Sequence, residues 1–266
     1  MHSTSRLGAR LAVVLVFVLH AHAAIAGVSR GGSGEVERST RRGEQPAGRR
    51  LNLPPGIVIP YASTSIVGTI PGQRGIDLGL GAFWGVAEDL QVDAHLGPIH
   101  LGPAPGQGPH RLAITGGLVH TKPFELAGTL SMSLDTSGNS PLVSTVQPGV
   151  VAAIAFNERI WFEAGGHLPV STGPEASIGL SLPVRAHVAI SGHVEARLDS
   201  GLAVKKLGEA ATVPLGVSLR YKAGQTQGGW FMCPYVSGTQ FYTPQTGRVN
   251  TSAFSAGVLV GVPLKR

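Results

Sequence analysis

The longest regular pattern of apolar and polar positions along the chain lies in residues 75–97. Apolar side chains occupy every second position in 76–86 and again in 90–96, and glycine, histidine and carboxylates fill most positions between them. Because successive side chains of a strand point to opposite faces, this pattern predicts a long antiparallel hairpin that turns at Ala87-Glu88-Asp89. Strands of this length match those that cross a bilayer at a tilt, which need about 9–11 residues.

The same period of two residues recurs almost to the end of the chain, and no helical period of comparable length accompanies it. We predict twelve strands, at residues 57–70, 74–86, 89–101, 110–120, 123–134, 147–157, 159–169, 175–184, 186–198, 211–222, 229–242 and 250–263. An even number of strands is usual in bacterial membrane barrels. The expected fold is therefore all-β, an antiparallel up-and-down transmembrane β-barrel of about 12 strands.

The connections and the aromatic residues give this barrel an orientation. If the chain starts in the periplasm, the longer connections at 102–109, 135–146 and 199–210 are expected to be cell-surface loops, and the short turns periplasmic. Aromatic side chains gather near the two expected membrane interfaces, as in the girdles of membrane barrels. The periplasmic group is Trp84, Phe124, Phe156, Trp161, Phe162, Tyr221, Trp230 and Phe231, and the outer group is Phe241, Tyr242 and Phe254.

The N-terminal region carries the pattern of an exported protein. Arg6 and Arg10 precede the apolar run 11–19, and small residues follow it, so residues 1–26 are predicted to be a signal peptide cleaved after Ala26. An uncleaved anchor helix is the alternative, but the apolar run is short for a membrane span. Residues 27–52 contain few large apolar residues and predict a disordered basic linker in the periplasm, which leaves 53–266 for the barrel.

The distribution of charge argues against a nucleic-acid partner. The formal net charge is +6, but from Leu53 onward there are 13 basic and 12 acidic residues, so the excess of basic residues lies in the signal peptide and the linker. A nearly neutral barrel offers no basic surface for phosphates. Cys233 is the only cysteine, which excludes an intramolecular disulfide and a cysteine-based metal site. No cofactor is expected.

These features together resemble Gram-negative outer-membrane β-barrel proteins of the general porin-like type, over roughly residues 57–266. The resemblance is carried by the secretion signal, by the phrases FWGVAEDLQVDAHLG and AFNERIWFEAGGHLPV, and by the last strand, AFSAGVLVGVPL. It implies a location in the cell outer membrane, with outer-membrane lipid and the outer-membrane assembly machinery as partners. Such proteins commonly end on an aromatic residue, whereas this chain ends Pro263-Leu264-Lys265-Arg266.

The polar rows of the predicted strands supply the candidate lumen-lining residues. These are Asp77, Asp93, His95, Glu125, Glu163, His167, His187, Ser191, His193, Glu195, Arg197 and Arg220. Charge pairs within a polar interior are the interpretation that we favour for them. His95 and His100 are expected on opposite faces of one regular strand, so no zinc site is expected there.

One row permits a catalytic alternative. Ser191, His193 and Glu195 fall on one face of the predicted strand 186–198, and they are the residue types of a nucleophile, a base and an orienting acid. Neighbours two apart on one face are about 7 Å apart, which exceeds hydrogen-bond reach. No catalytic residue is therefore assigned.

Three functions remain open from the sequence. The first is a barrel without catalysis, either structural or a passive pore for small polar solutes. The second is an outer-membrane lipid hydrolase or acyltransferase that uses the row of strand 186–198. The third is a secreted soluble β-sandwich or adhesin, because alternation alone does not distinguish a sandwich face from a lipid-facing one.

Overall fold

The computed structural model describes residues 51–68, 74–102, 105–136, 143–172, 176–223, 229–250 and 254–265. All of them belong to one compact unit, Gly43–Arg266. The predicted signal peptide and the predicted linker lie outside the described residues, apart from Leu51 and Asn52. Within the described ranges, no helix is long and apolar enough to cross a membrane.

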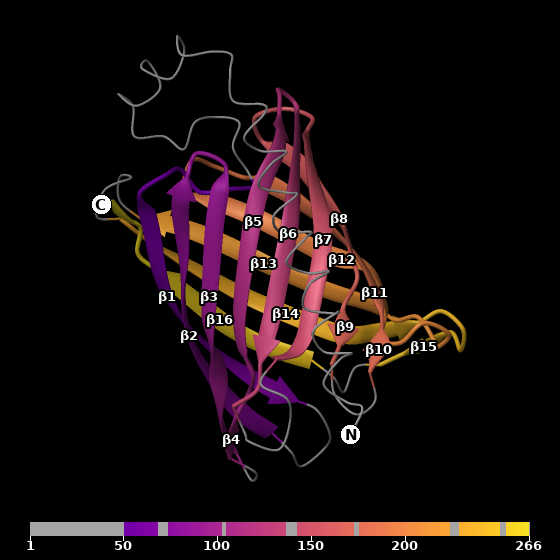
Figure 1. Cartoon of the computed structure of the whole chain (residues 1–266). Helices are drawn as coiled ribbons and strands as arrows, with labels where there is room; N and C mark the ends of the chain where they lie inside the picture. The colour runs from indigo at the N-terminus through magenta and orange to yellow at the C-terminus, as the bar shows by residue number, and fades with distance from the viewer. Residues whose placement is uncertain are drawn as a thin grey trace, which may run out of the picture. The chain divides into compact units, whose positions relative to one another are not determined.

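The described residues form twelve long strands and five very short ones (Figure 1). The long strands are β1 (Ile57–Gly68), β2 (Arg74–Ala87), β3 (Leu90–Leu101), β5 (His110–His120), β6 (Phe124–Leu134), β7 (Val143–Ala155), β8 (Ile160–His167), β11 (Leu180–Ala189), β12 (Val194–Val204), β13 (Val213–Ala223), β14 (Trp230–Thr243) and β16 (Phe254–Gly261). The short strands are β4 (Gly106–Gln107), β9 (Val170–Ser171), β10 (Ser177–Ile178), β15 (Arg248–Val249) and β17 (Leu264–Lys265).

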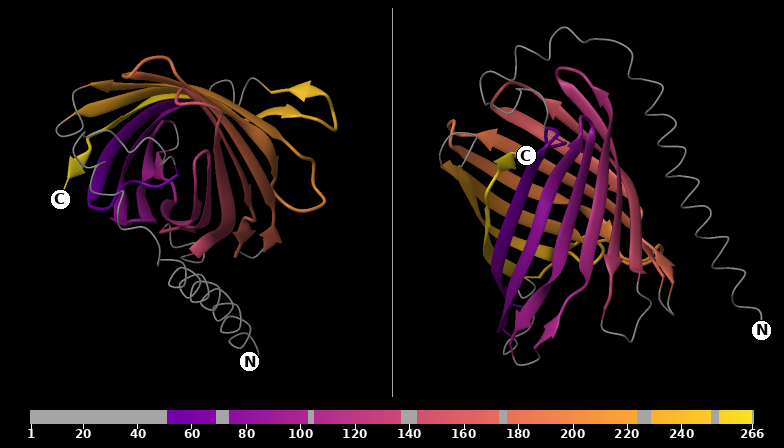
Figure 2. Two further views of the ribbon diagram at one scale, coloured as in Figure 1. Left: turned by 90° about the horizontal axis from the view of Figure 1, so that it is seen from above. Right: turned by 60° about the vertical axis from the view of Figure 1, so that its left-hand side comes forward.

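The sheet closes on itself. Each long strand pairs antiparallel with the next long strand, and β1 pairs with β16 from Tyr61↔Gly261 to Gly68↔Phe254. Seen from above, the strands enclose one lumen (Figure 2, left). Closure leaves no sheet edge with unpaired backbone groups, which is the condition for a sheet to cross lipid. The prediction of a twelve-stranded antiparallel barrel is confirmed, and the β-sandwich alternative is wrong because a sandwich needs two separate sheets.

The outer face of the barrel is apolar on strand after strand. In β6 and β7, Glu125, Ala127 and Ala153 are buried on the inner face, whereas Val150 and Ile154 are 50% and 46% exposed on the outer face. Other large apolar side chains exposed in the same way are Leu78, Leu80, Leu96, Ile114, Val188, Leu198, Val217, Leu219, Val236 and Val260. A surface this apolar is unfavourable in water, so it indicates a barrel surrounded by lipid.

The predicted aromatic girdle is only partly correct. Trp84, Phe156, Phe162, Tyr221 and Trp230 are exposed on the outer face near the short turns. Trp161 and Phe231 instead point into the lumen, where they contact His187 and Arg220. Each directly adjoins an outward aromatic residue in the sequence, and successive side chains of a strand point to opposite faces. The girdle at this end is therefore thinner than the sequence predicted.

Most predicted strand boundaries hold within a few residues, but two strands are misplaced. The chain does not turn near Arg185, since β11 continues to Ala189 and the turn occupies residues 190–193. Ser191 closes this turn, because its Oγ accepts the backbone N–H groups of His193 and Val194, both at 3.2 Å. In consequence residues 199–204 belong to β12. Of the predicted loop 199–210, only residues 205–210 lie outside the long strands.

The residues before β1 lie against the inner wall at the short-turn end. Leu51 N donates to Glu125 Oε2 at 3.1 Å, Asn52 Nδ2 to the carbonyl of Asp89 at 3.1 Å, and Leu53 N to Gln91 Oε1 at 2.8 Å. Asn52 is buried. The first residues of the described chain are therefore held within the mouth of the barrel.

Because residues 51–53 are held against the inner wall, a larger side chain at Gly85 is expected to destabilise the barrel. A Cβ at Gly85 would collide with the carbonyl oxygen of Pro54, whereas a Cβ at the outward Gly128 meets nothing nearer than Leu118 Cδ1 at 3.8 Å. We expect Gly85→Val to lower the free energy of unfolding by about 1–3 kcal/mol, because overpacking displaces the docked segment. Urea unfolding should show little change for the control Gly128→Val, and equal effects would contradict the docking.

Candidate functional site in the barrel lumen

A histidine between two carboxylates forms the centre of one wall of the lumen. His187 on β11 lies with Nε2 3.2 Å from Glu163 Oε1 on β8 and Nδ1 3.0 Å from Glu195 Oε1 on β12. The ring of Trp161 stacks on the imidazole at 4.7 Å between centroids, with 12° between the planes. His187 and Glu163 are buried, and the cluster joins the three neighbouring strands β8, β11 and β12.

Ion pairs extend from this cluster along the wall. Arg185 reaches Glu163 at 3.3 Å and Asp199 at 3.0 Å, and Arg197 Nε donates to Asp199 Oδ2 at 2.8 Å. At the other end Arg220 on β13 lies 3.9 Å from Glu195 and 5.2 Å above the ring of Phe231. Acids and bases therefore alternate along β8, β11, β12 and β13, as expected for charges that neutralise one another inside a polar lumen.

The opposite wall carries aromatic and small side chains. The hydroxyl of Tyr61 on β1 hydrogen-bonds His95 Nδ1 on β3 at 3.0 Å, and its ring stacks on Phe83 at 4.8 Å. A Cβ at Gly79 would lie 2.7 Å from Ser63 Oγ and 2.9 Å from His95 Cε1, so glycine on β2 makes the room for this group. The wall is thus shaped by rings that lie over glycine backbone.

The structure corrects the expectation for His95 and His100. His100 Nδ1 lies 2.7 Å from Asp77 Oδ1, and its imidazole lies over Gly75 of β2. His95 lies over Gly79, which is on the same face of β2 as Gly75. Both histidines therefore face inward. The physical reason is a register shift in the β2–β3 pairing between Leu78 and Leu80, which inverts the alternation of β3.

The remaining predicted lumen residues on β3, β6 and β8 are inward and hydrogen-bonded. Asp93 accepts from Gln91 Nε2 at 2.8 Å, and His167 Nδ1 lies 3.3 Å from Thr129 Oγ1. Glu125 is buried at the short-turn end, where it accepts from Leu51 N. All three side chains therefore lie on the inner face, and their part in the function of the lumen stays a prediction.

Ser191 and His193 do not line the wall, and this prediction was wrong. Both are exposed in the turn 190–193, and the Oγ of Ser191 is engaged by backbone N–H groups. His187 and Glu195 belong to different strands, with Ala189 opposite Glu195 in the register. The predicted strand 186–198 is therefore the end of β11, a turn and the start of β12. Ser191, His193 and Glu195 do not form one row on a single strand.

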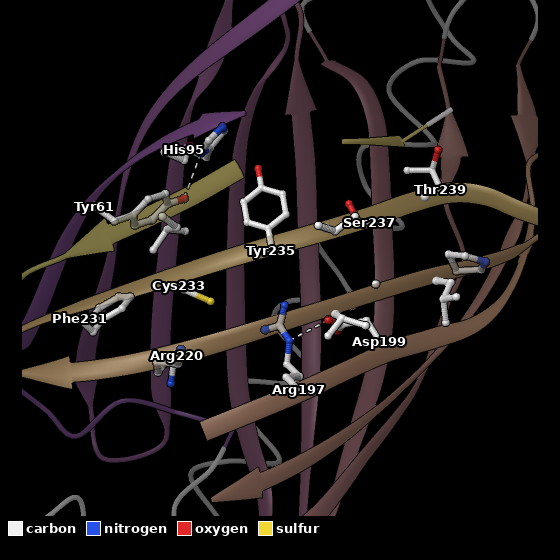
Figure 3. A pocket seen from close by; sticks show the side chains of 18 of the residues that line it. Tyr61, His95, Arg197, Asp199, Arg220, Phe231, Cys233, Tyr235, Ser237 and Thr239 are labelled. Atoms are coloured by element: carbon white, nitrogen blue, oxygen red, sulfur yellow. Dashed lines mark hydrogen bonds and ion pairs between the residues drawn. The ribbon is translucent and has the colours of Figure 1, made fainter. Parts of the chain in front are cut away.

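A cavity of about 480 Å³ lies between the two walls (Figure 3). Its lining includes Tyr61 and His95 on one side and Arg197, Asp199 and Arg220 on the other. Inward residues of β14 complete it, namely Phe231, Cys233, Tyr235, Ser237 and Thr239. Among the described residues, no group of three or more histidine, cysteine, aspartate or glutamate side chains could hold a metal ion.

Four residues that matter in this site were missed by the sequence analysis. Arg185 was assigned to a turn and Asp199 to a loop, because the hairpin was split at the wrong place. Trp161 was assigned to the outer girdle, although its position two residues before Glu163 indicates the inner face. Tyr61 follows Pro60, which interrupts the predicted strand, so the alternation there does not show which face the tyrosine occupies.

Comparisons with known proteins found no matching family model and no matching curated protein. Several solved structures are similar in fold. An anion-selective porin from Comamonas acidovorans shares 10% identity, with 79% of this chain and 98% of that chain covered and a TM-score of 0.40. OmpT, an outer membrane protein of Vibrio cholerae, shares 7% identity, with 78% and 96% covered and a TM-score of 0.42.

A bacterial polysaccharide outer membrane secretin is a third such structure. It shares 9% identity, covers 82% of this chain and 100% of its own, and has a TM-score of 0.41. These scores are low, and the barrel assignment is based on the strand register of this chain. That register gives the fold of a closed twelve-stranded antiparallel β-barrel.

Proposed function

We propose that this protein is a barrel of the outer membrane that acts as a passive pore for small polar solutes, without catalysis. The observation that carries the proposal is the cavity of about 480 Å³ inside a barrel in which charged side chains of neighbouring strands pair with one another, among them Arg185 with Glu163 and His187 with Glu195. Paired charges need no bound ligand to neutralise them, so the lumen can hold water.

The outer surface supports a membrane location. Apolar side chains such as Leu80 and Val236 are 57% and 56% exposed on the outside, where lipid would cover them. Outer-membrane lipid is therefore a proposed partner, and assembly would need the machinery that inserts such barrels. The longer connections lie at the end opposite the short turns, which we assign to the cell surface.

The lumen supports conduction of polar solutes. Several inward positions on β13, β14 and β16 carry small side chains, including Gly216, Ser218, Ser237, Ser255 and Gly257. Small inward residues leave space between the walls, while the nearly equal number of acids and bases predicts weak ion selectivity.

The test is conductance of the purified full chain in planar lipid bilayers. We expect stepwise conductance, and we expect Ser237→Trp to reduce the single-channel value by roughly half or more, because Ser237 lines the cavity. Leu219→Trp is the matched control, since Leu219 is exposed on the outer face of β13.

Absence of conductance from protein whose folding is shown by heat-modifiable migration would overturn the pore. A reduction of the same size in Leu219→Trp would show that the cavity is not the conducting path. The catalytic alternative has no observation in its favour, because Ser191 and His193 lie in a turn.

A further inference from the structure

The charges around the cavity are less balanced than those of the lumen as a whole. Besides His95, the ionisable side chains lining it are Arg197, Arg220, Asp199, Tyr61, Tyr235 and Cys233, so the ion-pairing charges are two guanidinium groups and one carboxylate. That carboxylate is shared, because Asp199 Oδ2 accepts from Arg197 and Oδ1 accepts from Arg185. On the lining itself two guanidinium groups accompany one carboxylate, and the carboxylate nearest to Arg220, that of Glu195, lies 3.9 Å away and is not part of the lining.

The two lining arginines lie close together in the sheet. Arg197 on β12 is opposite Ser218 on β13, and Arg220 is two residues further along the same face. Diagonal neighbours of this kind are roughly 7–8 Å apart between Cα atoms, within the reach of two long side chains. Both side chains keep access to the lumen, with 36% of Arg197 and 41% of Arg220 exposed.

Each guanidinium retains donors that can face the cavity. Arg197 donates to Asp199 through Nε, and its two terminal nitrogens can still donate to a further acceptor. Arg220 lies over the Phe231 ring and forms a long ion pair with Glu195 at 3.9 Å. A planar guanidinium binds a carboxylate through two parallel hydrogen bonds, which a lysine ammonium cannot do.

Aromatic rings provide the rest of the surface. Tyr61 and Phe83 are stacked at 4.8 Å on one side of the cavity, and Tyr235 and Phe231 come from β14 (Figure 3). Arg197 on β12, Ser218 on β13 and Tyr235 on β14 lie opposite one another in the register, so Arg197 and Tyr235 come from the same wall of the cavity (Figure 3). The cavity is within the range of about 300–1,000 Å³ that small ligands occupy.

We propose that this cavity is a binding site for a small organic monocarboxylate with an apolar, ring-like body. The carboxylate lies between Arg197 and Arg220, and the body contacts the rings of Tyr61 and Tyr235. The proposal deepens the pore function by naming the class of solute, and it depends on that function for the route of entry. Binding itself can be measured without conduction.

The experiment titrates benzoate and its uncharged analogue benzamide into the purified, folded full chain in detergent micelles, by isothermal titration calorimetry with empty micelles subtracted. We expect benzoate to bind at least about tenfold more tightly than benzamide, and Arg197→Gln or Arg220→Gln to weaken benzoate about tenfold. The control is Arg159→Gln, in the exposed turn between β7 and β8, which should leave the affinity unchanged.

Equal affinities for benzoate and benzamide, or an equal loss in Arg159→Gln, would overturn the site. Inorganic phosphate binding as tightly as benzoate would overturn the role of the rings. If either arginine variant does not fold, Ser237→Asp places a competing carboxylate on the lining and should weaken benzoate by a similar factor. Benzoate binding without conductance would overturn the pore and keep the site, whereas conductance without binding would do the reverse.

Discussion

Val150→Arg is expected to lower the free energy of unfolding by about 2–4 kcal/mol, the cost of an arginine on the lipid face near the bilayer midplane. Val150 lies near the middle of β7, and its side chain is 50% exposed on the outer face. Lipid cannot hydrate the guanidinium, so the folded state alone bears this cost. Urea unfolding of the barrel in lipid vesicles, followed by tryptophan fluorescence and heat-modifiable migration, would measure it.

Gln147→Arg is the matched control on the same strand. Gln147 is paired with the buried Ser131, so it faces the lumen, where water and carboxylates can accommodate an arginine. We expect a loss much smaller than that of Val150→Arg. Similar losses at both positions would show that the two faces do not differ in environment, and the lipid-facing assignment would fail.

His187→Ala is expected to lower the free energy of unfolding by about 3–5 kcal/mol, the scale for removing one member of a buried charged group. The imidazole separates Glu163 from Glu195 at 3.2 and 3.0 Å, and its loss leaves two carboxylates facing each other with fewer donors. Trp161 also loses its stacking partner. The same urea titration measures the change.

Two further variants show whether the effect comes from the charges. His193→Ala removes a histidine of the exposed turn and should change stability little. Adding Glu163→Gln to His187→Ala should recover part of the loss, because only one carboxylate then lacks the imidazole. If Glu163→Gln destabilises the His187→Ala variant as much as it destabilises the unchanged protein, Glu163 and Glu195 do not repel each other when the imidazole is removed.

The pattern of strands can be predicted from the sequence, whereas most of the polar network cannot, and the reason is physical. A period of two residues reports which face a side chain occupies, so it separates the lipid-facing rows from the face on which Asp93, His167 and Glu125 lie. The same period does not mark the turn between β11 and β12, because Val188, Ile190 and Val194 stay in step across it. The turn was therefore placed near Arg185 instead of at 190–193, and Ser191 and His193 were wrongly assigned to the wall.

Bulges limit the prediction in a second way. A single extra residue in one strand inverts its alternation, and nothing in the local pattern of β3 indicated that this occurs between His95 and His100. Only the pairing with β2, which brings Asp77 beside His100, reveals that both imidazoles face inward. Register between strands depends on contacts that a single strand does not contain.

The sequence by itself determined that the chain forms long strands with one apolar and one polar face, in the number that a closed barrel needs. Alternation is a local property, since it follows from the geometry of each strand. Only the tertiary structure decided which charges meet, because Glu163, His187 and Glu195 come from three strands whose contact depends on register. The cavity is likewise a product of closure, which sets β1 against β16 and brings the two walls to face each other.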